Sequence, residues 1–455
     1  MATRLRAFAQ RHPKLPLVLL AVVCTASLGA RVGGLADPCN APCTTANDHL
    51  LVFDEAYYVN AARVIAGLSP PAGAHYAGDP SGDDPNAEHP QLVKLVIAGS
   101  IELFGDGPLA WRLGSLICGT LAIVGMYALT RAAGGGPWLA LGASTLMACD
   151  NLALVMGRIG TLDIYVLAAM VWSAALYLRG HPLLAGVLLG VGACLKEVAP
   201  YLLLVFALVE LLRWVGSRTD AARGSVRLVV FAVSTWAVFL VLLWILGLIA
   251  PPYDPVAGKL VAGGPFGHFA HMVSYAEHQT SPNGPTGIAS YPWQWIFDYK
   301  PITYLAINPV APSHALFGIH ASTHFLGFIS PPIMLLWLPG LALAVLELRR
   351  RRDEVGLRRR RDEVGLVALA WSLGTFVPFE LESLIWSRTS YLYYMLVVMP
   401  GIYLAVAQLV ARGGELLARS SGHVALRRAG WALLGVWALS VLLAAIVLYP
   451  FTPWP

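Results

Sequence analysis

Residues 15–30, "LPLVLLAVVCTASLGA", form an almost uniformly apolar run that directly follows four cations, Arg4, Arg6, Arg11 and Lys14. A cleaved signal peptide has a small-residue cleavage site after a short apolar core, whereas this run ends in "GARVGG". We therefore predict an uncleaved membrane-spanning helix. Because Lys and Arg collect on the cytoplasmic side of a span, the helix is expected to begin in the cytoplasm.

The whole composition agrees with a membrane protein. The 455 residues are 57% hydrophobic and 13% charged, against about 45–50% and about 25% in soluble domains. One bilayer crossing needs about 20 apolar residues, so the length allows many spans and leaves little for a separate soluble domain. The formal charge of +5 is modest, and nucleic acid is not expected as a partner.

Ten further apolar segments are long enough to be candidate spans, so about eleven are predicted in total. They lie near residues 108–131, 136–156, 162–179, 182–196, 199–215, 228–250, 324–347, 364–384, 390–411 and 430–449. The expected fold is an all-α polytopic membrane protein with one transmembrane domain, residues 1–455. An odd number of spans places the C-terminus outside, together with two long loops, about 36–107 and 251–323.

The charges in the loops support this orientation. The loops assigned inside carry Arg131, Arg179, Arg213, Arg218, Arg223, Arg227, Arg412, Arg419, Arg427, Arg428 and eight arginines between positions 349 and 361. The two loops assigned outside hold few cations for their size. Nine of the twelve histidines lie in or at the edge of these two loops. Any chemistry is therefore expected on the outer face of what we take to be the cell membrane.

Two of the six cysteines, Cys39 and Cys43, lie in the polar segment "DPCNAPC" of the first outer loop. The other four lie in apolar runs, where a buried thiol is the ordinary finding. In an oxidising compartment Cys39 and Cys43 could pair with each other. Their short spacing also fits two free thiols, so both states remain open.

An acidic pair begins the segment "FDEAYYVNAAR" at residues 53–63. Asp54, Tyr58 and Ala62 share one face of a helix, which indicates an amphipathic helix along the membrane surface. A second amphipathic run, "EHPQLVKLVIAGSIELFG", follows in the same loop. Carboxylates are favoured at helix N-termini as caps and through the macrodipole. Spacing alone therefore favours a capping role for the acidic pair.

Four cations fall near one predicted membrane level on the outer side, namely Arg112, Arg158, Lys196 and Arg388. Charged groups at membrane depth are costly and mark candidate functional sites, although interfacial anchoring explains any one of them. Together with Asp54 and Asp163 they indicate a site that holds a membrane-embedded anion. A lipid-linked phosphate fits, because guanidinium groups bind phosphate oxygens bidentately and an ammonium acts as a point charge.

The order of motifs is similar to that of the dolichyl-phosphate-mannose protein O-mannosyltransferases. The motifs are "DE" at 54–55, "HPQLVK" at 89–94, "WRL" at 111–113, "GRIGTLD" at 157–163, "LKEVAPY" at 195–201, "SYPWQWIFDYKPITY" at 290–304 and "RTSYLYYMLVVMP" at 388–400. More broadly the chain resembles the GT-C membrane glycosyltransferases that use polyprenyl-phosphate sugars, which include aminoarabinose transferases. It departs from the family's "HPPLGK" at Gln91 and Val93, and the 251–323 loop is too short for the soluble domain of eukaryotic members.

This resemblance implies an eleven-span GT-C fold and an outward-facing cavity. It also implies inverting transfer of mannose from a polyprenyl-phosphate donor to Ser or Thr of exported proteins. Asp54 would be the general base, and Glu55 its neighbour in acceptor binding. The remaining site residues carried over by position are Arg112, Lys196, Arg388 and Arg158 for the donor phosphate, and His89, Lys94, Asp163, Tyr57, Trp293 and Trp295 for substrate contacts.

The reaction implied needs no metal or other cofactor, because the leaving phosphate is already an anion. Glu55, Glu88 and the outer histidines leave a divalent ion open, although ligands without fixed spacing are a weak metal signal. One alternative is transfer of aminoarabinose or arabinose to a glycolipid or cell-wall acceptor. Alternatives of other classes are a flippase for lipid-linked sugars and a scaffold that binds them without turnover. Transporters often have paired inverted repeats, and the sequence shows none.

Overall fold

The computed structural model describes residues 13–40, 42–216, 220–307, 323–350, 363–419 and 424–449. Most of these residues are helical. The helices are α2 (Leu15–Val32), α3 (Glu55–Ile65), α4 (Leu92–Phe104), α5 (Pro108–Ala132), α6 (Pro137–Cys149), α7 (Asn151–Met156), α8 (Asp163–Leu178), α9 (Pro182–Leu195), α10 (Tyr201–Val215), α11 (Ala221–Ile249), α12 (Gly264–His278), α13 (Pro292–Trp295), α14 (Pro331–Met334), α15 (Trp337–Arg350), α16 (Val364–Trp386), α17 (Met399–Arg419) and α18 (Val424–Val447). The arginine-rich segment 351–361 lies outside the described residues.

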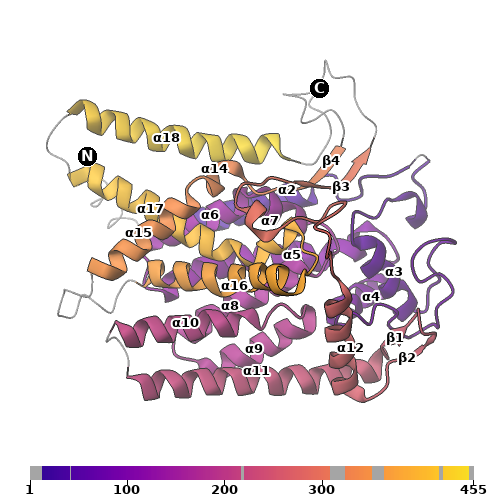
Figure 1. The fold of residues 1–455 in the computed structure, drawn as a ribbon. Helices are drawn as coiled ribbons and strands as arrows, with labels where there is room; N and C mark the ends of the chain where they lie inside the picture. The colour runs from indigo at the N-terminus through magenta and orange to yellow at the C-terminus, as the bar shows by residue number, and fades with distance from the viewer. Residues whose placement is uncertain are drawn as a thin grey trace.

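The long helices form one bundle, with α11 along one edge and α18 along the opposite edge (Figure 1). The short helices α3, α4 and α12 gather at one end of this bundle (Figure 1). Two antiparallel hairpins lie at the same end, β1 (Tyr253–Asp254) with β2 (Lys259–Leu260) and β3 (Ile302–Ile307) with β4 (Thr323–Gly327). The two predicted outer loops therefore come together in space.

Six helical segments in the described part of the chain are long and apolar enough to cross a membrane. They are Leu15–Val32, Pro108–Ala132, Ala221–Ile249, Pro331–Arg349, Val364–Trp386 and Val424–Val447, and the shorter apolar helices are α6, α8 and α9. The predicted all-α polytopic fold is confirmed. The number of eleven spans remains a prediction.

The helix α8 forms the centre of the bundle, because nearly all of its side chains are buried. It packs against α5 and α9, and α9 packs in turn against α11. Small residues allow these close approaches. A Cβ atom at Gly190 of α9 would lie 2.6 Å from the Thr235 carbonyl oxygen of α11. By contrast, α11 and α18 leave many apolar side chains exposed, as expected of helices that face lipid.

Three predicted spans need correction. The segment 136–156 is divided into α6 and α7 at Asp150, whose buried carboxylate accepts hydrogen bonds from the amides of Ala153 (3.1 Å) and Ser330 (3.0 Å). The segment 324–347 begins in β4 and becomes helical only at Pro331. The segment 390–411 begins with a 3₁₀ helix, Leu392–Val397, before α17. In each case an apolar run conceals a change of backbone conformation.

Candidate functional site

Asp54 stands directly before α3, yet its side chain makes no capping hydrogen bond. The capping interpretation of Asp54 is therefore wrong. The carboxylate instead lines a cavity of about 780 Å³ at the end of the bundle where the loops gather. No hydrogen bond or ion pair to this carboxylate occurs among the described residues. It is consequently available to an incoming group.

The cavity brings together half of the site residues predicted from the sequence. They come from five separate parts of the chain, and they are Asp54, Tyr57, His89, Asp163, Lys196 and Arg388. The loop before α3 supplies Asp54, the junction of α9 and α10 supplies Lys196, and the turn after α16 supplies Arg388. The structure thus brings the carboxylate of Asp54 and the cationic side chains of Lys196 and Arg388 into one cavity from distant segments of the chain.

The Lys and Arg side chains that line the cavity, Lys196 and Arg388, each have a carboxylate partner. The Lys196 ammonium lies 2.6 Å from Asp163 Oδ1, and Arg388 Nε lies 3.2 Å from Glu382 Oε2. His89 Nδ1 lies 3.0 Å from Glu197 Oε2. Lys196 also lies over the rings of Tyr393 and Tyr394, at 5.3 and 5.5 Å from their centroids. These partners hold the cations at fixed positions around the cavity.

The environment of Asp54 moves its pKa toward neutrality. Burial raises the pKa of this carboxyl to about 7, the positive charge of Lys196 opposes the rise, and the negative charge of Asp163 adds to it. His89 opposes the rise in this pKa more weakly than Lys196 does. A general base works best when its pKa lies near the working pH. Asp54 is therefore suited to accept a proton at neutral pH.

Glu55 and Arg112 lie outside the cavity and bind each other. Arg112 Nε and Nη2 each donate a 2.8 Å hydrogen bond to one carboxylate oxygen of Glu55. Glu55 also accepts hydrogen bonds of 2.7 Å from the amides of Val52 and Gly160. Both charged side chains are fully buried. Neither side chain lines the cavity. The roles predicted for Glu55 in acceptor binding and for Arg112 in phosphate binding stay predictions.

Arg158 and Lys94 also lie outside the cavity. Lys94 Nζ lies 2.6 Å from Asp84 Oδ2 and donates to the carbonyl oxygens of Asn86 and His89. Arg158 donates to the Gly34 carbonyl oxygen and lies over the Phe325 ring. A buried charge needs such partners, and here the protein itself provides them. The predicted phosphate contact of Arg158 and the predicted substrate contact of Lys94 stay predictions.

The two tryptophans of "PWQW" do not line the cavity. Trp295 is fully buried, donates from Nε1 to Ser290 Oγ at 2.9 Å, and contacts Phe379 and Tyr394 edge to face. It supports the cavity wall from behind, because Phe379 and Tyr394 are lining residues. Trp293 is 49% exposed and is stacked on Tyr291.

The predicted site residues leave out one wall of the cavity and the carboxylate that pairs with Arg388. The wall is apolar and is formed by Trp236 and Phe239 of α11 with Phe269 and Met272 of α12. In the sequence, Trp236 and Phe239 cannot be told apart from side chains that face lipid. The carboxylate is Glu382, the partner of Arg388. Its position in the sequence, a charged residue near the outer end of an apolar span, could have identified it as a candidate site residue.

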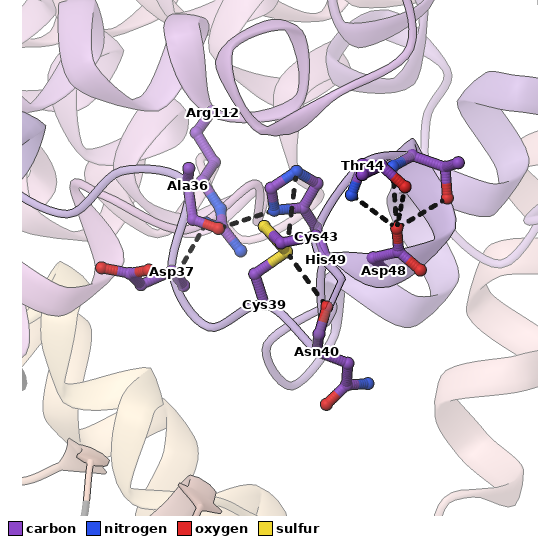
Figure 2. The surroundings of a disulfide bond; sticks show 10 residues. Ala36, Asp37, Cys39, Asn40, Cys43, Thr44, Asp48, His49 and Arg112 are labelled. Atoms are coloured by element: carbon purple, nitrogen blue, oxygen red, sulfur yellow. Dashed lines mark hydrogen bonds between the residues drawn. A yellow bond between two sulfur atoms is a disulfide. The ribbon is translucent and has the colours of Figure 1, made fainter.

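Cys39 and Cys43 form a disulfide (Figure 2). Their sulfur atoms and the His49 ring lie close enough to form a three-ligand metal group, but both sulfurs are bonded to each other. No second group of three such ligands occurs in the described part of the chain, the cavity included. His49 Nδ1 is hydrogen-bonded to the Ala36 carbonyl oxygen at 2.7 Å.

Comparison with solved structures places the chain among the GT-C membrane glycosyltransferase folds. Its TM-score against the S. cerevisiae protein O-mannosyltransferase Pmt1-Pmt2 complex bound to the sugar donor is 0.67, over 96% of this chain and 90% of that chain, at 13% identity. ArnT from Cupriavidus metallidurans bound to undecaprenyl phosphate gives 0.51, over 96% and 75%, at 17% identity. At these identities the likeness establishes the fold alone.

Sequence comparison gives a more particular family likeness. Residues 88–244 match the family described as dolichyl-phosphate-mannose-protein mannosyltransferase. A polyprenol-phosphate-mannose–protein mannosyltransferase from Corynebacterium glutamicum is 33% identical over 132 residues, which are 29% of this chain and 25% of that protein. The matched segment thus spans a quarter of that relative. The resemblance predicted from the motifs is confirmed.

Proposed function

We propose that the protein is an inverting glycosyltransferase that moves mannose from a polyprenyl-phosphate donor to a Ser or Thr hydroxyl of exported proteins. The observation that carries this proposal is the unpaired Asp54 carboxylate, which shares one cavity with Lys196 and Arg388. The family match over residues 88–244 supports it. Mannose and a protein acceptor are also the substrates in the printed name of the C. glutamicum relative.

In the proposed reaction the acceptor hydroxyl attacks the anomeric carbon of the sugar, and Asp54 accepts the hydroxyl proton. The bond between the anomeric carbon and the phosphate oxygen breaks, and the polyprenyl phosphate leaves with the electron pair. Attack on the face opposite the leaving group inverts the anomeric configuration. Proton transfer to a positioned carboxylate typically contributes about 10²–10⁴-fold in rate.

Lys196 and Arg388 would stabilise the charge that develops on the leaving phosphate. Their carboxylate partners keep them in place before the donor arrives, so the charge stabilisation needs little reorganisation. The wall formed by Trp236, Phe239 and Phe269 offers an apolar surface next to these charges. It suits the first isoprene units of a lipid whose phosphate is held by the two cations.

We propose that no metal ion takes part, because the leaving group carries its own negative charge and two cations already face it. An unchanged transfer rate after prolonged treatment with EDTA is the expected result. Loss of transfer that is restored by one divalent ion would contradict this part of the proposal.

We also propose that the cavity faces the extracytoplasmic side of the cell membrane, with the N-terminus in the cytoplasm. The Cys39–Cys43 disulfide supports this side, because disulfides persist in oxidising compartments. Labelling of engineered single cysteines with a membrane-impermeant maleimide in intact cells tests it. Position 102 in α4 should label, and position 223 should label only after permeabilisation.

The function is tested by incubating the purified protein with a panel of polyprenyl-phosphate sugars and a Ser/Thr-rich peptide. Mass spectrometry then shows which donor is consumed and where the sugar is attached. Mannose on peptide hydroxyls is the expected outcome. Consumption of an aminoarabinose or arabinose donor with a glycolipid acceptor would instead support the alternative transferase. Movement of donor across vesicles without any transfer would support a flippase and refute the proposal.

A further inference from the structure

The lining of the cavity holds more carboxylates than cations. Its lysine and arginine side chains are Lys196 and Arg388, and its carboxylates are those of Asp54, Glu88, Asp163, Glu197 and Glu382. Three of these carboxylates pair with a lysine, an arginine or a histidine of the same lining. Asp54 and Glu88 have no hydrogen bond or ion pair to their carboxylates among the described residues. A bound donor phosphate would add negative charge, so the loaded cavity is complementary to a cation.

Glu88 belongs to the part of this lining that is open to water. Its side chain is half-buried, and the lining residues Tyr57 of α3 and Tyr275 of α12 are 38% and 41% exposed. The lining residues Lys196 and Phe239, by contrast, are buried. Lys196 and Phe239 thus line the inner part of the cavity, whereas Glu88 and the two tyrosines lie on the side from which a water-soluble acceptor can enter.

The Glu88 carboxylate lies close to the rings of both tyrosines. Burial raises the pKa of Tyr275 to about 12, and the negative charge of Glu88 is the next cause of this rise. The pKa of Tyr57 is raised by burial, by the charge of Asp54 and by that of Glu88. The Tyr57 ring is also stacked on His75, with 4.0 Å between the ring centroids. Aromatic faces attract cations, and a carboxylate beside them can complete an ion pair. We call Glu88, Tyr57 and Tyr275 the cation subsite.

The cation subsite lies close to Asp54, the proposed general base. Asp54 directly precedes α3, and Tyr57 lies in the first turn of this helix, so the two residues are separated by about 4.5 Å along the helix axis. The charges of Asp54 and Glu88 both act on the Tyr57 ring. An extended peptide advances about 3.5 Å per residue. A side chain one or two positions away from the hydroxyl that receives the sugar can therefore reach Glu88 while this hydroxyl lies beside Asp54.

We propose that Glu88 determines acceptor specificity by binding, together with the rings of Tyr57 and Tyr275, a lysine or arginine side chain of the acceptor close to its target Ser or Thr. This inference rests on the proposed function. The acceptor cation offsets the excess negative charge of the loaded cavity and helps to hold the target hydroxyl beside Asp54. The donor phosphate does not compete for Glu88, because two like charges repel each other. No bond forms or breaks at Glu88.

The first test uses the natural protein with three acceptor peptides that differ only in the residue before a single Thr, which is Lys, Gln or Glu. The kcat/KM for the Lys peptide should exceed that for the Gln peptide about 5-fold, the range of a partly solvated ion pair. The Glu peptide should be the poorest acceptor. Added salt should reduce these differences, because it screens charges near the surface. Equal kcat/KM for the three peptides at low salt would overturn the proposal.

Two variants assign the preference to Glu88. Glu88→Gln should accept the Lys and Gln peptides equally, and Glu88→Lys should prefer the Glu peptide, a reversal that loss of folded protein cannot produce. Glu102→Gln, which neutralises an exposed carboxylate on α4 outside the cavity lining, is the matched control and should keep the natural preference. A preference for the Lys peptide that persists in Glu88→Gln would overturn the proposal. A raised KM for donor in Glu88→Gln with an unchanged peptide preference would overturn it too, because Glu88 would then contact the sugar.

Peptide binding gives a readout that needs no sugar transfer. Fluorescence anisotropy of the three labelled peptides should show the tightest binding for the Lys peptide, and this advantage should be lost in Glu88→Gln. A protein that shows this binding pattern but transfers no sugar to any peptide would refute the proposed function while supporting the cation subsite. Transfer of mannose to all three peptides with equal kcat/KM would support the proposed function and refute the role of Glu88.

Discussion

Replacement of Asp54 by Asn should abolish transfer and yet stabilise the folded protein. In the folded state burial raises the pKa of this carboxyl from 3.8 to about 7. The folded protein therefore binds this proton more tightly than the unfolded chain does. Between about pH 4 and pH 7, stability falls as pH rises, and above pH 7 the full cost of the charged carboxylate is present. Asparagine carries no charge and removes this cost.

The size of the effect follows from the shift. One pKa unit corresponds to about 1.4 kcal/mol, so a rise of about three units sets an upper value of about 4 kcal/mol. Asp54 faces a cavity that admits water, so we expect about 2 kcal/mol at pH 8 after allowance for solvent screening. The difference from the natural protein should shrink toward zero near pH 4, where both side chains are neutral.

Thermal unfolding of the purified protein in detergent, followed from pH 4.5 to pH 8.5, measures this difference. Glu102→Gln, which neutralises an exposed carboxylate on α4, is the control and should leave the unfolding midpoint unchanged at every pH. Asp54→Asn should raise the midpoint most at high pH. A midpoint that is lowered, or raised equally at all pH values, would refute the reasoning, because Asp54 would then not be a carboxylate destabilised by its surroundings.

Three other outcomes are expected. Lys196→Ala and Arg388→Gln should each lower kcat about 10²-fold, as the loss of a preorganised hydrogen-bond donor does. A change in steady-state kcat of less than about 3-fold would show that the residue does not belong to the phosphate site. The rate of transfer should rise with pH through about 7 as Asp54 loses its proton, and a rate that is flat from pH 5.5 to 8 would contradict the base assignment. Glu55→Gln should destabilise the folded protein by about 3–5 kcal/mol, because Arg112 would then be buried without a full charge partner. An unchanged unfolding midpoint would refute the structural role of the Glu55–Arg112 pair.

The fold could be predicted from the sequence because apolar runs of membrane-spanning length are hard to mistake. The sequence did not predict where the backbone conformation changes within such runs. The segment that begins at residue 324 looks like a span, but its first residues form β4, and periodicity cannot separate a short buried strand from a helix. Asp150 divides another run because its carboxylate accepts hydrogen bonds from the nearby Ala153 amide and from the Ser330 amide 180 residues away.

The candidate site was predicted in outline for a related reason. Charged residues are rare in a chain of this composition, so Asp54, Lys196 and Arg388 were conspicuous. The sequence does not show which charged side chains face a cavity and which form buried ion pairs with each other. Arg112 and Glu55 are 57 positions apart and pair with no contact to the cavity. The same ambiguity explains why spacing favours a capping role for Asp54, although its side chain makes no capping hydrogen bond.

The central claim is that Asp54 accepts the proton of the acceptor hydroxyl beside a donor held by Lys196 and Arg388. The most direct measurement loads purified Asp54→Asn with polyprenyl-phosphate-mannose, determines donor affinity, and follows single-turnover transfer to a Ser/Thr peptide in the same preparation. We predict donor affinity within about 3-fold of the natural protein and transfer slowed by at least about 10²-fold. Transfer by the bound donor at close to the natural rate would contradict the account.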